Sequence, residues 1–288
     1  MSDDRPQPLR IAVVETCDAP PSTADNLMTG LLSLARAAAA GARLVLFPEL
    51  FLTGYFLDRA MVERAAAVGE ALARLHAAAG ELGVDVVAGA PLLEGQRLLN
   101  TIAVLRAGRT AEYYVKTHLY PSERDWFAPG GSLWTGEVAG WPCGILICYE
   151  LGFPEIARTL ALAGARLLLA PSAWGMGRAR IWDVASLARA IENSCYLAAA
   201  DQAGGNGALE FRGASRVVDP FGRVVAGEGP PDMEVRGRGG LHRLWLTDLD
   251  TDLPEKARNG QDGWHRYFTD RRPELYRRLC EGPPDGSG

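Results

Sequence analysis

The chain has 288 residues and a formal net charge of −5, with 48% hydrophobic and 23% charged residues. This balance is typical of a globular protein with a sizeable core, and it argues against the basic surface that nucleic-acid binding requires. No run of 18 apolar residues occurs, and the polar segment 1–6 lacks the apolar part of a secretory signal. We therefore expect a cytoplasmic protein with no nucleic-acid or membrane partner.

The first third of the chain alternates apolar strands with helices. One helix can be capped by Ser22 or Thr23 and ended by Gly41, and a second, alanine-rich helix is expected at 62–79. Strands are expected at 9–14, 44–47 and 84–90. Apolar strands that alternate with helices predict a sheet whose faces are buried by those helices.

The middle of the chain begins with a predicted hairpin, formed by strands at 100–105 and 110–115. A polar, aromatic loop at 120–131 and a short strand near Val138 follow. Three apolar residues then run directly into Cys148, and a helical pattern follows at 156–162. This order predicts a strand, a sharp turn and a helix, with Cys148 at the strand's carboxyl end, where a nucleophile can be presented. Taken alone, a cysteine after such a run is usually a small buried hydrophobe.

The last part of the chain adds one more helix and several strands. The helix is expected at 181–192, with an apolar face made of Ile181, Val184, Leu187, Ala188 and Ile191. Strands are expected at 166–170, 196–200 and 241–246, a hairpin at 215–226, and a Gly/Pro-rich, mobile segment at 229–240. No linker or internal repeat is evident, so we expect one domain of mixed sheets covered by helices.

The cysteines and histidines do not form a recognisable ligand pattern. The five cysteines are scattered without a CxxC pair, and the four histidines are isolated. The sequence therefore indicates neither a disulfide framework nor a zinc site, and we expect no metal or other cofactor.

Three polar residues, Glu49, Lys116 and Cys148, each directly follow an apolar or β-type run. Strand ends are where α/β proteins place their chemistry. A carboxylate could accept the thiol proton, and an ammonium could stabilise first the thiolate and then an oxyanion, so the trio would suffice for acyl transfer. Each residue alone has an ordinary explanation, and spacing does not prove that the three converge.

The segments around these three residues resemble the signatures of the nitrilase superfamily, the carbon–nitrogen hydrolases, in the same order. The similarity also extends to later segments and covers residues 9–276. The matching segments are 47–50 with 53–55, 114–119, 146–150 with 153–155, 189–193 and 213–222. The resemblance implies a four-layer α-β-β-α sandwich in one domain, 1–288, with a core at about 9–276 and a tail at 277–288. It also implies a homodimer or higher homo-oligomer, in which subunits pair through the helix after Cys148 and the helix at 181–192.

The resemblance also implies roles for individual residues. Glu49 would be the general base, Lys116 would stabilise the tetrahedral intermediate, and Cys148 would attack the substrate to form a thioester. The backbone N–H of Tyr149 would complete the oxyanion site. A second acid is expected in the loop after Lys116, with Glu123 the best match and Asp125 the alternative, while Glu150 is expected to anchor the turn.

The substrate is less sharply defined. Tyr149 stands where true nitrilases commonly have Trp, which favours amide cleavage. We expect a small aliphatic or ω-amino amide to be hydrolysed to an acid and ammonia, with Glu150 or Asp125 as a reader of a substrate amine. The pocket walls are expected to include Tyr55, Trp126, Trp174 and Met176.

Four alternatives remain open from the sequence. A carbamoylase would need a cation for the substrate carboxylate, which Arg178 or Arg180 could supply. A nitrilase, an enzyme that transfers the acyl group to an amine, and a catalytically idle binding protein are the others.

Overall fold

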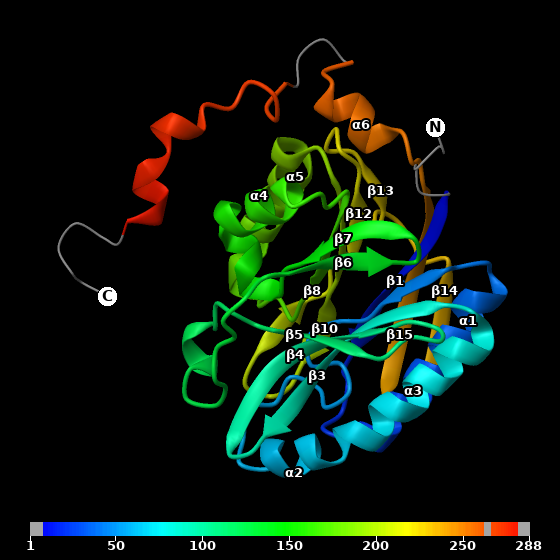
Figure 1. Ribbon diagram of the computed structural model, residues 1–288. Helices are drawn as coiled ribbons and strands as arrows, with labels where there is room; N and C mark the ends of the chain where they lie inside the picture. The colour runs from blue at the N-terminus through cyan, green and yellow to red at the C-terminus, as the bar shows by residue number, and fades with distance from the viewer. Residues whose placement is uncertain (1–7, 262–265, 282–288) are drawn as a thin grey trace.

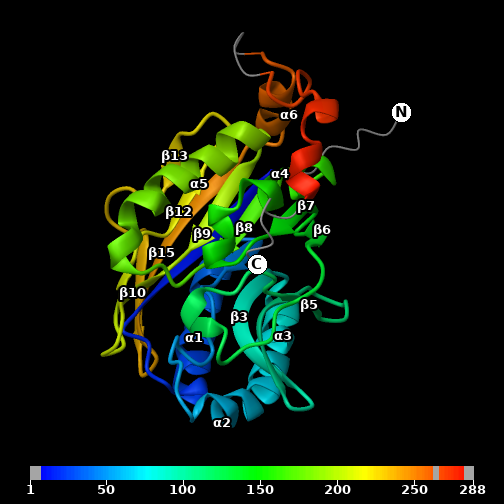
Figure 2. The ribbon, with the colours of Figure 1, turned by 90° about the vertical axis from the view of Figure 1, so that its left-hand side faces the viewer.

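Two mixed β-sheets face each other, and helices cover both outer faces (Figures 1 and 2). The computed structural model describes residues 8–261 and 266–281. The predicted four-layer α-β-β-α arrangement is confirmed by these elements. The polar segment 1–6 and the end of the predicted tail, 282–288, lie outside the described residues.

The first sheet has nine strands in the order β11-β10-β1-β2-β3-β4-β5, with β15 also paired to β1 and β14 paired to β15. Its central strand pairs are parallel, and the predicted hairpin appears as the antiparallel pair β4–β5. The strands are β1 (Leu9–Cys17), β2 (Leu44–Leu46), β3 (Asp85–Glu94), β4 (Arg97–Leu105), β5 (Glu112–Val115), β10 (Gln202–Gly205), β11 (Glu210–Arg212), β14 (Met233–Gly237) and β15 (Gly240–Leu249).

The second sheet has six strands in the order β13-β12-β9-β8-β7-β6. The parallel strands β7, β8 and β9 form its centre, and the apolar sequences of β8 and β9 are buried on both faces. The strands are β6 (Trp134–Val138), β7 (Trp141–Ile145), β8 (Leu167–Pro171), β9 (Tyr196–Ala200), β12 (Arg216–Val218) and β13 (Val224–Ala226).

The helices lie on the two outer faces. Figure 1 shows α1 (Thr23–Ala39) and α3 (Val68–Leu82) against the first sheet, and α4 (Pro154–Leu162) and α5 (Ala179–Asn193) against the second. The remaining helices are short: α2 (Met61–Ala66), α6 (Leu253–Arg258) and 3₁₀ turns at Pro121–Glu123, Cys148–Gly152, Met176–Arg178, Pro273–Leu275 and Arg277–Cys280. Among the described residues, no helix is both long and apolar enough to cross a membrane.

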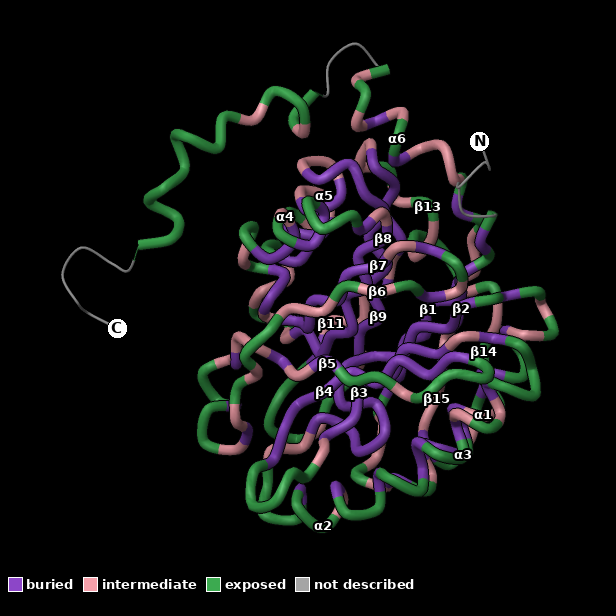
Figure 3. Tube along the Cα trace, in the orientation of Figure 1, coloured by how far each residue is buried: buried purple, intermediate pink, exposed green. Residues whose placement is uncertain are grey.

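The buried residues form two main layers of core, which Figure 3 shows as purple segments between exposed outer surfaces. The first lies between the two sheets and continues between the second sheet and helices α4 and α5, and the second lies between the first sheet and its helices. Local sequence signals explain the helix ends: the Ser22 hydroxyl accepts a hydrogen bond from the N–H of Asp25, and Gly83 ends α3 in the left-handed conformation.

Two predictions of local structure were wrong. The predicted single helix at 62–79 is two helices, α2 and α3, which meet at Ala67 and extend to Leu82. The segment 229–240, expected to be a mobile loop, contains strand β14, which pairs with β15 over five residue pairs. A strand can form there because the neighbouring chain supplies its hydrogen bonds, and composition does not reveal such pairing.

The predicted apolar face of α5 was wrong in part. Ile181 and Val184 are 51% and 59% exposed, whereas Trp182, Ala185 and Arg189 are buried. The indole N–H of Trp182 donates to the carbonyl of Ala214, and the guanidinium of Arg189 donates to the carbonyl of Leu151, so both buried side chains have hydrogen-bond partners. The helix therefore exposes Ile181 and Val184, whereas Leu187 of the predicted face is partly buried against the core.

Candidate active site

Glu49, Lys116 and Cys148 come together between the two sheets, each at the carboxyl end of a strand or just after it. Glu49 and Lys116 are fully buried and Cys148 is 4% exposed. The ammonium nitrogen of Lys116 lies 2.6 Å from Oε1 of Glu49. Cys148 and Glu49 share a neighbour, since Sγ of Cys148 donates to the carbonyl of Ala173 (3.7 Å) and the N–H of Ala173 donates to Oε2 of Glu49 (3.2 Å).

Unusual backbone geometry places two of these residues. Cys148 has φ +47° at the start of a 3₁₀ turn, a left-handed conformation that a non-glycine residue rarely adopts and that is found at functional sites. The loop at Glu49 packs directly on Gly89 of β3, where a Cβ would collide with the backbone of Pro48 and Glu49. The side chain of Gln202 holds the same loop by donating to the carbonyl of Glu49 at 2.7 Å.

Glu123 completes a buried cluster around the ammonium. Its carboxylate lies 2.8 Å from Nζ of Lys116, and it accepts hydrogen bonds from the hydroxyl of Tyr55 and the backbone N–H of Tyr120. Asp125, the alternative second acid, is exposed on the same loop. The structure therefore places Glu123, and not Asp125, against Lys116.

Burial and mutual charge set the ionisation of the cluster. Burial raises the pKa of Glu49 to about 7, although Lys116 opposes the rise. Burial also lowers the pKa of Lys116, but the carboxylates of Glu49 and Glu123 outweigh it and the net pKa is raised. The pKa of the Cys148 thiol is raised well above its usual value by burial and by Glu49. The resting cluster therefore pairs an ammonium with a neutral thiol, and attack requires the thiol proton to be removed.

Glu150 anchors the turn that carries Cys148. Its buried carboxylate accepts hydrogen bonds from the backbone N–H groups of Ile147, Thr117 and His118 and from the hydroxyl of Tyr114. These contacts join the Cys148 turn to the Lys116 strand end. Burial raises the pKa of Glu150, but the hydrogen bonds outweigh it and leave the pKa lowered. The predicted anchoring geometry is thus observed, and the carboxylate is not free for a substrate amine.

The predicted wall residues occupy different positions. Tyr55 is buried beside Glu123 and packs edge-on against the ring of Phe211 at 5.7 Å. Trp126 is half-buried at the edge of the apolar cluster that includes Tyr55. Trp174 is buried against Trp182, and Met176 is 47% exposed.

The aromatic ring of Tyr149 lies partly exposed near Cys148. It packs edge-on against the rings of Tyr120, at 5.5 Å between centroids, and Phe153, at 5.2 Å. Its backbone N–H directly follows the predicted nucleophile, which is the position required of the predicted oxyanion donor.

Sequence reasoning missed three polar residues that support the cluster. Asn100 donates from one amide nitrogen to both Glu49 and Glu123, at 2.7 and 3.1 Å. Asp201 accepts the N–H groups of Trp174 and Gln202, and burial raises its pKa to about 7. Asp201 and Gln202 directly follow strand β9, so the strand-end signal that marked Glu49 would also have found them.

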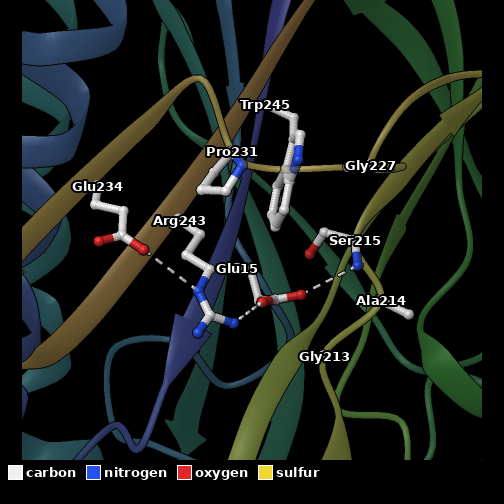
Figure 4. Close-up of a pocket in the computed structure, with 10 residues that line it drawn as sticks. Glu15, Gly213, Ala214, Ser215, Gly227, Pro231, Glu234, Arg243 and Trp245 are labelled. Atoms are coloured by element: carbon white, nitrogen blue, oxygen red, sulfur yellow. Dashed lines mark hydrogen bonds and ion pairs between the residues drawn. The ribbon is translucent and has the colours of Figure 1, made fainter.

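A separate cavity of about 400 Å³ lies between β1 and β15 of the first sheet and the 213–215 and 227–231 segments (Figure 4). The Arg243 side chain lies between the carboxylates of Glu15 and Glu234 on its wall. None of the predicted site residues lines this cavity. Among the described residues, no group of three or more His, Cys, Asp or Glu side chains is placed to hold a metal ion.

Comparison with known proteins agrees with this geometry. A sequence model of the carbon–nitrogen hydrolase family matches residues 10–235. An (R)-stereoselective amidase from Pseudomonas sp. is 32% identical over 277 residues, 96% of each chain. A 2-oxoglutaramate amidase from Bacillus subtilis (strain 168) is 34% identical over 200 residues, 68% of this chain and 77% of the relative.

Solved structures lead to the same family. The crystal structure of an amidase from Nesterenkonia sp. is 32% identical, has a TM-score of 0.78 and covers 94% of this chain and 96% of its own. A mutant of that amidase carries a covalent addition of the acetamide moiety of fluoroacetamide at its active-site cysteine. The chain belongs to the carbon–nitrogen hydrolase family. It is an amidase-like enzyme of the nitrilase superfamily, as its three signature segments predicted.

Proposed function

We propose that this enzyme hydrolyses small aliphatic amides to a carboxylic acid and ammonia through a thioester on Cys148. The observation that carries the proposal is the buried cluster in which Lys116 bonds both Glu49 and Glu123, with Cys148 and Glu49 meeting at Ala173. This cluster supplies a base, an oxyanion-stabilising cation and a nucleophile without a metal.

The first half-reaction forms the thioester. Glu49 accepts the thiol proton while Sγ of Cys148 bonds to the amide carbon, and the carbonyl oxygen becomes an oxyanion that Lys116 and the N–H of Tyr149 stabilise. The carbon–nitrogen bond then breaks. The nitrogen leaves as ammonia after it takes the proton that Glu49 had accepted.

The second half-reaction restores the enzyme. Glu49 accepts a proton from water as the water oxygen attacks the thioester carbon. The carbon–sulfur bond of the resulting tetrahedral intermediate breaks, the acid is released, and the sulfur of Cys148 regains its proton from Glu49.

The surroundings of the site support a restricted substrate range. Small amides suit this site, because Cys148 is only 4% exposed and the buried rings of Tyr55 and Phe211 lie near it. Since Glu150 is saturated by protein donors and Asp125 is exposed, we favour aliphatic over ω-amino amides. The Pseudomonas relative, an (R)-stereoselective amidase, and the Bacillus relative, a 2-oxoglutaramate amidase, also favour amides as substrates.

The proposal is tested by ammonia release from a panel of short amides, N-carbamoyl amino acids and nitriles. We expect turnover of the amides and none of the nitriles. Preferential turnover of N-carbamoyl amino acids would favour the carbamoylase alternative. Turnover of nitriles alone, or of no compound on the panel, would overturn the proposal.

A further inference from the structure

Arg178 is held between two aromatic rings near the candidate active site. Its guanidinium carbon lies 4.0 Å from the ring centroid of Tyr120 and 5.2 Å from that of Trp174. The carbonyl of Arg178 also accepts a hydrogen bond from the indole N–H of Trp174 at 2.9 Å. Both backbone and side chain of Arg178 are therefore fixed against Trp174, and the residue is partly exposed.

Both rings belong to segments that touch the catalytic cluster. Trp174 directly follows Ala173, the residue that contacts both Cys148 and Glu49. The N–H of Tyr120 donates to Glu123 at 2.7 Å, and the Tyr120 ring contacts that of Tyr149, the neighbour of Cys148. The guanidinium therefore bridges two segments that enclose the site, at its partly exposed edge.

The charge of Arg178 has no carboxylate partner within the described part of the chain. Nearby arginines differ: Arg189 pairs with Glu192, and Arg212 and Arg216 both pair with Asp183. Stacking on rings occupies the faces of a guanidinium and leaves its edge N–H groups available. Such a planar fork matches a carboxylate, which it can bind through two parallel hydrogen bonds.

The charge balance of the site indicates what the free N–H groups of Arg178 could bind. The described cluster contains two carboxylates, Glu49 and Glu123, against the single ammonium of Lys116. At a pH above the Glu49 pKa of about 7, a substrate with a negative charge approaching Cys148 would be repelled by the surplus carboxylate unless a cation lay near its charged end. Arg178 is a cation in a suitable position, since its two ring partners are attached to the segments that contact Cys148, Glu49 and Glu123.

We propose that Arg178 binds a carboxylate at the far end of the substrate's acyl chain, so that the preferred amides are monoamides of short dicarboxylic acids. This inference rests on the proposed amidase function and deepens it. Arg178 is then a specificity-determining residue that binds substrate away from the reacting carbon. Arg180, two residues further on and exposed, serves as the matched control.

The experiment compares amides that have the same shape and differ in charge. Succinamate is paired with 4-methylpentanamide, whose terminal methyl groups replace the two carboxylate oxygens, and glutaramate is paired with 5-methylhexanamide. Ammonia release gives kcat and KM for the wild type and for Arg178→Met, Arg178→Lys and Arg180→Met.

We expect the wild type to prefer at least one anionic amide over its neutral match by about 10-fold or more in kcat/KM. Arg178→Met should reduce that preference by about 10- to 100-fold, the range for a lost hydrogen-bonded charge pair, mainly through KM. Arg178→Lys should retain the preference only in part, because an ammonium lacks the two parallel N–H donors of a guanidinium. Arg180→Met should leave the preference within about 3-fold of the wild-type value.

Two outcomes would overturn the inference. The first is a wild type that hydrolyses neutral amides but shows no preference for their anionic matches. The second is equal loss on both members of a pair in Arg178→Met, which would indicate a purely structural role. Failure to hydrolyse any amide would instead overturn the proposed function itself, and the two failures are therefore distinguishable.

Discussion

Burial raises the pKa of Glu49 to about 7, which gives the proposed reaction a definite pH dependence. Only the ionised carboxylate can accept the thiol proton of Cys148, and a raised pKa keeps Glu49 protonated at lower pH. The value of kcat/KM for an amide should therefore rise with pH and level off above about pH 7. Because Glu49, Lys116 and Glu123 titrate together, the midpoint belongs to the cluster.

A pH profile of kcat/KM between pH 4 and 9 measures this dependence. An acid limb centred near the ordinary carboxyl pKa, between about pH 4 and 5, would mean that Glu49 is not the base or is not buried during the reaction. Circular dichroism at each pH serves as the control, since it separates the loss of activity from the loss of fold.

Glu123 and Asp125 provide a matched pair for testing the second acid. Glu123 is buried against Lys116, whereas Asp125 lies exposed two residues later. Glu123→Gln should lower kcat by about 100-fold, because it removes a charge that positions the oxyanion-stabilising ammonium. Asp125→Asn should change kcat by less than about 2-fold. Steady-state ammonia release decides the point, and a larger effect at Asp125 would reverse the assignment.

The Cys148 turn depends on Glu150, the buried carboxylate that joins it to the Lys116 strand end. Glu150→Gln replaces one acceptor oxygen by a donor that faces N–H groups, so we expect the free energy of unfolding to fall by about 1.5–3 kcal/mol. Denaturant unfolding measures this change. Glu155→Gln, at an exposed position in the first turn of α4, is the control and should have a much smaller effect.

The stabilising contribution of Glu150 should also depend on pH. Its pKa is lowered in the folded state, so the contribution is present above the unfolded-state pKa and is lost as the pH falls through the folded-state value. The difference in unfolding free energy between wild type and Glu150→Gln should therefore shrink on acidification. A difference that grows at low pH would contradict the lowered pKa.

The exposed apolar side chains on α5 provide a test of the homodimer that the family resemblance implies. Ile181 and Val184 are more than half exposed, and Leu162 at the end of α4 is 48% exposed. If a second copy covers this face, Val184→Asp should shift the protein to a monomer, because burying an unpaired carboxylate is costly. Light scattering of wild type and variant measures the shift, with Val62→Asp on α2 as control. A monomeric wild type would contradict the expected homodimer.

The secondary-structure elements could be predicted where periodicity and burial agree, and not where tertiary contacts decide. Strands β8 and β9 were visible as apolar runs because both faces are buried. The inner face of α5 was misassigned because Trp182 and Arg189 are buried through hydrogen bonds to distant carbonyls. Strand β14 exists because β15 lies beside it, which local composition does not express.

Across the whole molecule, the sequence indicated the catalytic candidates through their strand ends and their family resemblance. It could not show that Glu49, Lys116 and Glu123 bond one another, because their contacts depend on how the two sheets pack. Nor could it identify Asn100, which links both carboxylates from the middle of an apolar strand. That Arg178 has no carboxylate partner among the described residues likewise emerges only when its neighbours in space are known.

The central claim is that Cys148 carries the acyl group during amide hydrolysis. Intact-mass spectrometry of enzyme quenched during turnover of a short amide, followed by peptide mapping, tests it most directly. We expect a transient adduct of the acyl mass on the peptide that contains Cys148, and neither adduct nor ammonia release in a folded Cys148→Ala variant. An adduct on another residue, or wild-type turnover by Cys148→Ala, would contradict the mechanism.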